Sequence, residues 1–510
     1  MTAIQPARTL FITTAILLSA FAQGAGAQAE TQPPEIRREF RGIWVATVGN
    51  IDWPSRPGLS AWEQQAELIG ILNRALALNM NAIVFQIRPA ADALYSSKIE
   101  PWSESLAGQM GVPPQPSYDP LKFAIDEAHK RGLELHAWFN PYRARYARPA
   151  SDISSTHIAV VRPGLVRTYG SYLWMDPGDP AVRNRTTEVI ADVVKRYDVD
   201  GIHIDDYFYP YIENDAAGKP IDFPDGATWN RYLRRGGKLS RADWRRSNVD
   251  SLVRQLYRRI KATKKTVKFG VSPFGIWRPG NPQGIAGLDA YTELYADSKK
   301  WLNNGWLDYI TPQLYWHTRR TQQSYSRLLG WWVQENTHGR HVWAGNFTSR
   351  VGTTNPDQWD AQELLNQIAL TRAQPGASGN VHFSARVFVR DPDSIVAKLK
   401  AGPYADLALV PASRWLDAAA PAKPAVAARI EKTNGATVVD LDPRKEVRPW
   451  LWTVRTRFPT GWTSQIVPGW VRTHYVSFRN APVPEEVLVT AVDRSGNESS
   501  LARAKVPGAR

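Results

Sequence analysis

The sequence predicts an α/β fold class, a (β/α)8 (TIM) barrel followed by a small β-sandwich. Two observations lead to this prediction. Eight short apolar segments alternate with segments of helical periodicity over about 350 residues, the pattern of a parallel barrel with covering helices. After an Ala/Pro-rich run at 417–424, only strand-like segments follow. An open, doubly wound sheet is the alternative for the first part, but no Gly-rich phosphate loop opens a helix after the first strand.

The first half of the barrel is predicted from four strands and the helices between them. The first helix carries apolar residues at helical spacing, among them Leu68, Ile71 and Leu72. The predicted strands are 42–47, 82–88, 133–140 and 200–207, and the predicted helices are 61–80, 120–131 and 181–197. A long insertion at 141–180 follows the third strand, and its length indicates a function beyond simple connection.

The second half of the barrel repeats the same alternation and completes the set of eight strands. The predicted strands are 267–272, 309–315, 341–346 and 381–384, and the predicted helices are 249–263, 291–304, 325–335 and 357–371.

The composition divides the chain into five parts. We expect a signal peptide at 1–27, an N-terminal tail at 28–37, the barrel at 38–416, an Ala/Pro linker at 417–424 and a β-sandwich at 425–510. The close of the last part is similar to the end of fibronectin type III domains, and its length suits that fold. Domains of this kind bind other molecules or act as spacers, so we expect this one to contact the cell wall or envelope proteins. Because the linker has nothing to bury, few contacts are expected to cross it.

The N-terminus has the parts of a secretory signal. Arg8 gives a weakly basic start, residues 10–22 are mostly apolar, and Ala25-Gly26-Ala27 offers small residues for cleavage. A permanent membrane anchor is the alternative, but the apolar run is short for a bilayer span, and no later stretch is apolar enough to be one. We therefore expect a secreted protein of the periplasm or cell envelope without a transmembrane segment.

Cysteine content and charge narrow the chemistry. The chain has no cysteine, which excludes disulfides, thiolate metal sites and a cysteine nucleophile. Its formal net charge of +15 indicates an anionic partner or simple solubility. Export argues against nucleic acid as that partner, and an acidic cell-wall polymer or a carboxylated sugar fits better. The arginine-rich segment 231–265 is interpreted as a solvated helical face.

The strand at 200–207 ends in two adjacent carboxylates, Asp205 and Asp206. Side chains alternate along a strand, so Ile202 and Ile204 share an apolar face, while Asp205 lies on the ionisable face. Two neighbouring carboxylates in a half-buried site raise the pKa of one of them, which yields one proton donor and one anion. Glycosidic cleavage uses such a pair. In the alternative, Asp205 is a structural acceptor and Asp206 a cap.

Polar and aromatic side chains gather at the C-terminal ends of the predicted strands, the end where (β/α)8 barrels collect catalytic groups. The candidate substrate-binding residues are Gln86, Arg88, Trp138, Asn140, Tyr142, His203, Tyr207, Trp277, Gln313, Tyr315, Trp316 and Asn346. Aromatic rings pack on the C–H faces of sugars, while amides and carboxylates bind hydroxyls, so this set predicts a carbohydrate cleft. For any single tryptophan, core packing is the alternative role. Arg88 is expected to bind an acidic or hydroxyl-rich part of the sugar, and an ion pair with Asp92 or a rim acid is the alternative.

Five motifs occur in order along the barrel: RGIWV (41–45), QIRPAADALY (86–95), HAWFNPYR (136–143), DVDGIHIDDYFYP (198–210) and TPQLYW (311–316). They resemble the glycosyl-hydrolase-like proteins, a family once catalogued as a domain of unknown function that includes bacterial glycosidases of denuded peptidoglycan strands. The resemblance covers residues 38–400 and implies a (β/α)8 barrel that acts on a sugar polymer. Lipoprotein members of the family carry a cysteine at the mature N-terminus, and this chain has none.

Resemblance to other glycosidases suggests a division of roles. The adjacent aspartates are similar to those of hexosaminidases in which one Asp orients the substrate's 2-acetamido group and its neighbour protonates the leaving oxygen. The central strand more distantly resembles that of chitinase-like barrels, with His203 in place of one acid and Tyr207 where their catalytic Glu stands. We expect Asp206 to be the general acid and Asp205 the anionic partner that orients an acetamido group or the sugar cation.

The favoured function is a secreted glycoside hydrolase of a cell-wall polysaccharide, most directly peptidoglycan glycan, without metal or cofactor. A metal-dependent hydrolase or deacetylase is one alternative, with His136, His203 and Asp205 meeting inside the barrel, although no His-x-His pair supports it. A non-catalytic glycan-binding protein is the other, because the rim of the sixth strand offers Gln313 and Tyr315 but no second acid.

Overall fold

The structure is a computed structural model that describes residues 33–149, 151–353, 358–444, 448–478 and 481–508. The expected signal peptide lies outside the described residues, and so does the first half of the expected tail. Within the described part of the chain, no helix is both long and apolar enough to cross a membrane.

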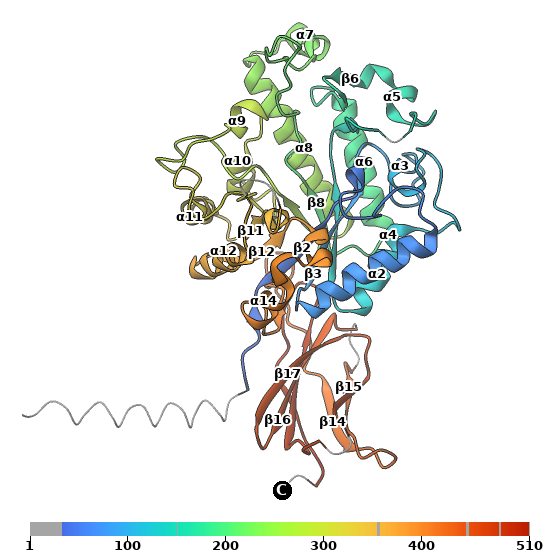
Figure 1. Ribbon diagram of the computed structural model, residues 1–510, viewed down its shortest axis with the longest axis vertical. Coiled ribbons are helices and arrows are strands. Elements are labelled where there is room, and N and C mark those ends of the chain that lie inside the picture. Colours follow the sequence, from blue (N-terminus) through green and yellow to red (C-terminus); the bar gives the residue numbers. More distant parts are fainter. Residues whose placement is uncertain (1–32, 150, 354–357, 445–447, 479–480, 509–510) are drawn as a thin grey trace, which may run out of the picture.

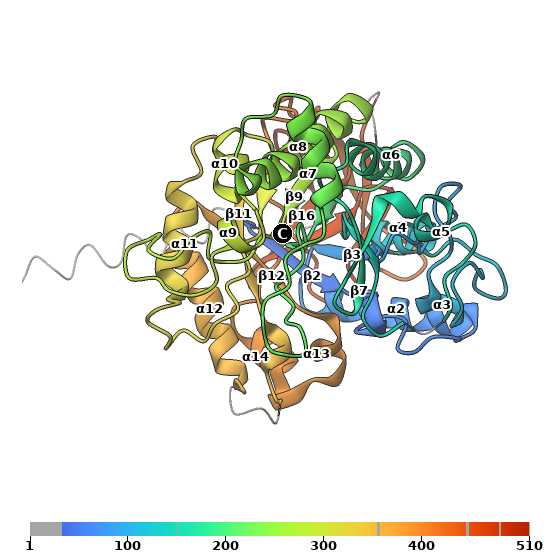
Figure 2. The same cartoon turned by 90° about the horizontal axis from the view of Figure 1, so that it is seen from above.

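Eight parallel strands close into a barrel, in the order β10-β11-β12-β2-β3-β4-β8-β9. These strands are β2 (Phe40–Val45), β3 (Ala82–Arg88), β4 (Glu134–Phe139), β8 (Gly201–Ile204), β9 (Lys268–Val271), β10 (Tyr309–Ile310), β11 (His341–Asn346) and β12 (Ala377–His382). The predicted (β/α)8 barrel is therefore confirmed, although the eighth strand begins at Ala377, four residues before the predicted 381–384. Figure 2 shows the ring of strands surrounded by the helices.

The alternation of side chains along each strand builds two separate cores. On β3, Ile83, Phe85 and Ile87 belong to the large apolar cluster between the barrel and its helices. Val84 points the other way, into a second cluster inside the barrel that also contains Trp44 and other aromatic residues. The strands are buried on both faces, as expected for a parallel barrel.

The helices begin at residues suited to cap them. Ser60 and Glu63 form a reciprocal capping box at the start of α2. Asp119 and Asp179 cap α4 and α6, each just before a proline. The larger helices are α2 (Ala61–Ala77), α4 (Pro120–Lys130), α6 (Pro180–Arg196), α7 (Gly226–Arg234), α8 (Arg241–Thr263), α11 (Tyr325–Gln334) and α12 (Ala361–Ala373). Shorter ones are α3 (Glu104–Ala107), α5 (Ile158–Val161), α9 (Ala290–Glu293), α10 (Ser298–Asn303), α13 (Ala385–Arg390) and α14 (Ile395–Ala401).

Three sequence predictions differ from the structure in detail. The expected helix 291–304 is two helices, α9 and α10, because Tyr295 has a positive φ and Asp297 caps a new helix. The expected strand 309–315 ends at Ile310, since Pro312 cannot donate a ladder hydrogen bond. The insertion 141–180 folds into a three-stranded sheet of its own, β5-β7-β6, with β5 (Arg143–Arg145), β6 (Val166–Tyr169) and β7 (Tyr172–Met175).

The C-terminal part consists of two antiparallel sheets below the barrel in Figure 1, in the orders β14-β15-β18 and β17-β16-β19-β20. Their strands are β14 (Ala425–Ile430), β15 (Thr437–Asp442), β16 (Leu451–Phe458), β17 (Gly461–Pro468), β18 (Thr473–Ser477), β19 (Glu486–Val492) and β20 (Ala502–Lys505). Val439 from one sheet and Trp452 and Val489 from the other share one apolar core, so the sheets pack face to face. The likeness to fibronectin type III domains stays a prediction.

The sandwich packs tightly against the N-terminal ends of the barrel strands. Arg494, just after β19, forms an ion pair of 3.1 Å with Asp200, and a second one with Asp198. Trp450 packs edge-on against His129 of the barrel. Further apolar contact comes from a cluster of Ile36, Leu409, Leu451 and Val492.

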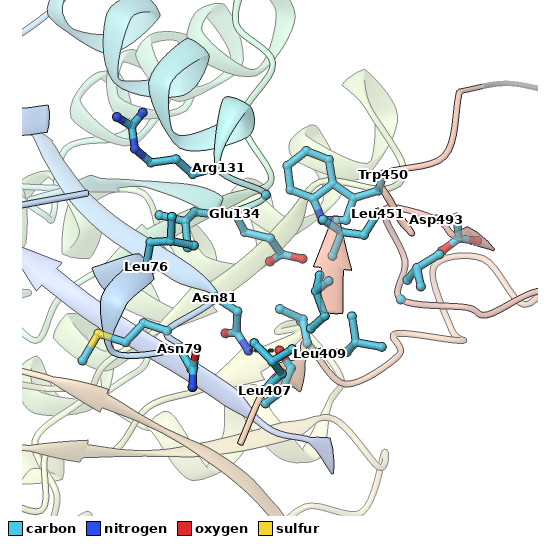
Figure 3. Close-up of a pocket in the computed structure, with 18 residues that line it drawn as sticks. Leu76, Asn79, Asn81, Arg131, Glu134, Leu407, Leu409, Trp450, Leu451 and Asp493 are labelled. Carbon is cyan, nitrogen blue, oxygen red and sulfur yellow. Dashed lines mark hydrogen bonds between the residues drawn. The ribbon is translucent and has the colours of Figure 1, made fainter. Parts of the chain in front are cut away.

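Figure 3 shows Trp450 and Leu451 of the sandwich and Glu134 of the barrel around a cavity of about 60 Å³ at this boundary. A short parallel pair, β1 (Arg37–Arg38) with β13 (Ala408–Leu409), also lies here. The expectation that few contacts cross the linker is therefore wrong. The composition of a linker says nothing about the two surfaces on either side of it.

Candidate active site

Strand β8 places Asp205 and Asp206 at the end of the barrel opposite the sandwich, directly after Ile204. Asp205 is held by donors on both oxygens. Trp138 Nε1 donates to its Oδ2 at 3.1 Å, and Asn140 Nδ2 lies 3.2 Å from each oxygen. The backbone N–H of Tyr207 donates to Oδ1 at 3.3 Å. Because every partner is a donor, the contacts favour the ionised form of Asp205.

Asn140 is itself fixed in this orientation. Its Oδ1 accepts hydrogen bonds from the backbone N–H groups of Tyr142 at 3.2 Å and Arg143 at 2.7 Å. The amide nitrogen must therefore face Asp205. Burial raises the pKa of Asp205 to about 6, the charge of Arg143 opposes that rise, and the charge of Asp206 adds to it. At neutral pH Asp205 is thus mostly an anion.

Asp206 has a different set of partners. The hydroxyl of Tyr211 donates to its Oδ2, and the side chain of Gln313 also hydrogen-bonds to it. Burial raises the pKa of Asp206 above its ordinary value, and the hydrogen bonds from Tyr211 and Gln313 oppose that rise. Asp205 is 3% exposed and Asp206 is 5% exposed, so both lie at the floor of the site. The two neighbours are therefore held by separate elements, one by β4 and its loop and the other by the loops after β8 and β10.

His203 lies below the aspartates, inside the barrel. Its Nε2 faces Ser272 Oγ at 2.9 Å and accepts from Trp44 Nε1 at 3.2 Å, so Nδ1 carries the proton toward Tyr309 Oη at 3.1 Å. Burial lowers the pKa of His203 well below its ordinary value. The expectation that His203 contacts substrate is wrong, because both ring nitrogens have protein partners and the residue is fully buried.

The hydrogen-bond chain continues from Tyr309 away from the site. Tyr309 Oη lies 2.9 Å from His136 Nδ1, and His136 Nε2 lies 2.9 Å from Glu134. His136 and His203 thus share Tyr309, while Asp205 faces Trp138, so the structure does not bring the three suggested metal ligands together. Across the described residues, no group of three or more His, Asp or Glu side chains is arranged to hold a metal ion.

Arg88 does not reach the site as a free group. Its Nε and Nη2 bind the two oxygens of Glu100 at 2.7 and 2.6 Å, and both side chains are completely buried. Its Nη1 donates to the carbonyl oxygen of Asn140 at 2.6 Å. The expected substrate-binding role of Arg88 is therefore wrong, and the ion pair with a rim acid is the correct alternative. The partner is Glu100 rather than Asp92.

Gln86, Asn346 and Tyr142 are also buried away from any substrate. Gln86 Oε1 accepts from the backbone N–H groups of Thr47 and Val48 at 2.9 Å. The side chain of Asn346 bonds to Tyr325, Gln367 and Asn380. Tyr142 has a buried hydroxyl without a partner. For these three residues the structure contradicts the expected contact with sugar, because inward-pointing positions below the rim are filled by packing.

The remaining aromatic candidates are half-buried. Trp277 stacks on Trp331 and donates to Asp297, on the side of α10. Tyr315 stacks on Phe347 with ring centroids 4.9 Å apart. Tyr315 and Trp316 line a cavity of about 590 Å³ together with His317, Arg319, Arg320, Gln323, Arg350, Gln358 and Trp359. Gln313, which hydrogen-bonds to Asp206, precedes Tyr315 on the same loop, but neither aspartate lines this cavity.

Sequence reasoning missed two residues of the site, Tyr211 and Arg143. Arg143 is the last residue of the motif at 136–143, so the motif contained the signal. Its guanidinium lies 4.4 Å from the ring centroid of Tyr207. Tyr211 follows the aspartates in a loop, and nothing in the sequence pattern indicates that this loop folds back onto Asp206.

Comparison with known proteins gives a family match and named relatives. The sequence model of a family described as glycosyl hydrolase-like 10 matches residues 39–361. Glycosyl hydrolase YngK of Bacillus subtilis (strain 168) is 42% identical over 409 residues, which cover 78% of this chain and 78% of YngK. Glycosyl hydrolase DigH of Escherichia coli (strain K12) is 38% identical over 387 residues, covering 70% of this chain and 86% of DigH.

Among solved structures, the PgaB (BpsB) glycoside hydrolase domain from Bordetella bronchiseptica matches with a TM-score of 0.46 and 15% sequence identity. The match covers 71% of this chain and 98% of that domain.

Proposed function

The chain belongs to the glycosyl hydrolase-like 10 family, and from this premise we propose that it hydrolyses glycosidic bonds in the glycan strands of peptidoglycan. The observation that carries the mechanism is the pair Asp205 and Asp206, adjacent in sequence but held by different donors. Family membership supports glycoside hydrolysis, and the residues of the site support the division of labour between the two carboxylates.

Asp205 suits the anionic role. Trp138, Asn140 and the backbone of Tyr207 all donate to it, and a positive charge from Arg143 lies nearby. An anion held there can orient a 2-acetamido group or stabilise the positive charge that develops on the sugar ring.

Asp206 suits the role of general acid. Burial raises the pKa of Asp206 above its ordinary value, which favours the protonated form that a general acid needs. Tyr211 and Gln313 fix the direction of the carboxyl group. A general acid must present its proton along one line to the glycosidic oxygen, and these two contacts set that line.

Half-buried aromatic rings provide the sugar-binding surface. Tyr207 directly follows the carboxylates, and Tyr315 and Trp316 line the cavity of about 590 Å³, which is large enough for sugar units. The signal-like N-terminus supports export, so we place the enzyme in the periplasm or cell envelope, where such a substrate is found. The sandwich would then contact the wall or envelope proteins.

The proposed function is tested by digestion of purified glycan strands, with and without stem peptides, followed by mass analysis of the products. We expect fragments with new reducing ends from the wild type and far fewer from Asp206→Asn. Binding of the strands without any release of fragments would instead identify a non-catalytic glycan-binding protein. An unchanged product level with Asp206→Asn would place the chemistry elsewhere.

A further inference from the structure

Arg143 is exceptional among the buried arginines that the structure describes. Arg41, Arg88, Arg245 and Arg455 each form an ion pair with a Glu or Asp side chain. Arg143 is 3% exposed, yet no ion pair joins it to any described carboxylate. Its Nε is buried without a hydrogen-bond partner, and its Nη1 makes a long contact of 3.3 Å to the carbonyl oxygen of Pro89.

The position of Arg143 is fixed inside the candidate active site. Its backbone N–H donates to Asn140 Oδ1 at 2.7 Å, the same amide that holds Asp205. Its guanidinium stacks on the ring of Tyr207, 4.4 Å from the centroid. The charge of Arg143 acts on Asp205, so the arginine and this carboxylate lie in one site.

The two aspartates do not satisfy the guanidinium, because their oxygens face other donors. Asp205 accepts from Trp138 and Asn140, and Asp206 accepts from Tyr211. An unpaired charge in a buried position is costly, whereas a guanidinium that meets a carboxylate gains a planar, two-pronged hydrogen bond. The charges of Arg143 and Asp205 act on each other without a direct hydrogen bond, so the guanidinium keeps an N–H group that the carboxylate of a ligand can bind.

We propose that Arg143 binds a carboxylate carried by the substrate next to the scissile bond, so that the enzyme selects acidic glycans. This inference rests on the proposed function and names the chemical group that the same site recognises. In peptidoglycan glycan the free lactyl carboxylate of a muramic acid unit has this chemistry, and a peptide attached there removes the charge. The role first expected of Arg88 thus falls to a residue that forms no ion pair with a described carboxylate and whose Nε has no hydrogen-bond partner.

The test compares two forms of one substrate. Peptide-free glycan strands are used with their lactyl carboxylates free, and again after conversion of these groups to methylamides. We expect the wild type to show a kcat/KM about 10- to 100-fold higher on the free acid, the range for one charge-assisted hydrogen bond. In Arg143→Gln that ratio should fall close to one, mainly through a higher KM on the free acid, and Arg143→Lys should recover part of it.

Arg145→Gln is the matched control. Arg145 is on the same short strand, β5, but its guanidinium binds the carbonyl oxygen of Ser151 in the insertion. This variant should keep the wild-type ratio between the two substrates.

Three results would overturn the inference. If the wild type cleaves both forms equally well, the site does not recognise a carboxylate, although the proposed function stands. If Arg143→Gln slows both forms by the same factor and shifts the pH profile, Arg143 acts on the aspartates instead of the substrate. If the wild type cleaves neither form, the proposed function fails and this inference fails with it.

Discussion

The hydroxyl of Tyr211 donates a hydrogen bond to Oδ2 of Asp206, from a loop five residues further along the chain. This contact lowers the pKa of Asp206 against the stronger effect of burial, and it fixes the direction of the carboxyl group. Asp205, the neighbour in sequence, has none of these partners. The difference between the two environments is the basis for assigning different roles to the two carboxylates.

Replacement of Tyr211 by Phe should change the pH dependence of the enzyme. Loss of the hydroxyl raises the pKa of Asp206, so the acid stays protonated to higher pH. We expect the alkaline limb of the kcat profile to move to higher pH, and kcat itself to fall because the carboxyl group is less well directed. The measurement is kcat against pH on soluble glycan fragments.

Tyr118→Phe serves as the control for this variant, since Tyr118 donates to Gln64 at 3.0 Å away from the site. It should leave the pH profile unchanged. An alkaline limb that does not move in Tyr211→Phe would mean that Asp206 does not control that limb.

The buried pair of Arg88 and Glu100 should matter for stability rather than for substrate affinity. Arg88→Ala leaves the carboxylate of Glu100 buried, and we expect a loss of about 3–5 kcal/mol in the free energy of unfolding. The double variant Arg88→Met/Glu100→Leu should recover only part of that loss, because Glu100→Leu also removes the ion pair that Arg185 forms with Glu100 at 3.8 Å. Chemical denaturation measures both values.

An exposed pair provides the comparison for this experiment. Lys122 and Asp126 lie 2.7 Å apart on the surface of α4, and Lys122→Ala should cost less than about 1 kcal/mol. If Arg88→Ala folds with wild-type stability and mainly raises KM, then Arg88 binds substrate after all.

Arg494 should couple the sandwich to the stability of the barrel. Burial alone would raise the pKa of Asp200, but the charges of Arg494 and His129 overcome this effect and lower it below the ordinary value. Arg494→Ala should therefore reduce the free energy of unfolding by about 1–3 kcal/mol at neutral pH.

The pH dependence of this loss has a defined sign. A group with a lowered pKa in the folded state stabilises the protein above its unfolded pKa, which is about 4 for an aspartate. The penalty of Arg494→Ala should thus be full at pH 7 and be lost only below that value, as the pH falls toward the lowered folded pKa of Asp200. Arg503→Ala, which removes an exposed pair with Glu486 in the same sandwich, should show little change at either pH. Equal penalties for Arg494→Ala at pH 7 and at about pH 2 to 3 would contradict the assigned role of Asp200.

The fold could be predicted from the sequence because it depends on patterns that the chain repeats. Period-two alternation, as in Ile83, Val84 and Phe85, identified the strands, and helical periodicity identified most of the helices between them. What the sequence did not show depends on contacts between distant segments. The packing of Trp450 on His129 and of Arg494 on Asp200 joins residues more than 290 positions apart, and the composition of the linker carries no trace of them.

Part of the candidate site could be predicted from the sequence for the same reason. Asp205 and Asp206 follow a barrel strand directly, and (β/α)8 barrels place their catalytic groups at the C-terminal ends of the strands. A side chain that is predicted to point into the barrel, however, can contact either the substrate or other protein residues, and the sequence does not distinguish the two. Arg88 and His203 both point inward, but each meets a protein partner below the rim. Arg143 points to the site from a strand within the insertion, where no barrel pattern applies.

The central claim, that Asp206 is the general acid and Asp205 the anionic partner, is tested most directly by leaving-group dependence. Loss of a general acid typically costs a factor of about 100 to 10,000 in rate, but an activated aryl leaving group needs little protonation. We predict that Asp206→Asn loses most activity on glycan strands and far less on an activated aryl glycoside, while Asp205→Asn is slow on both. Equal responses of the two variants to leaving-group quality would contradict this division of roles, and full activity in both would show that the pair is structural.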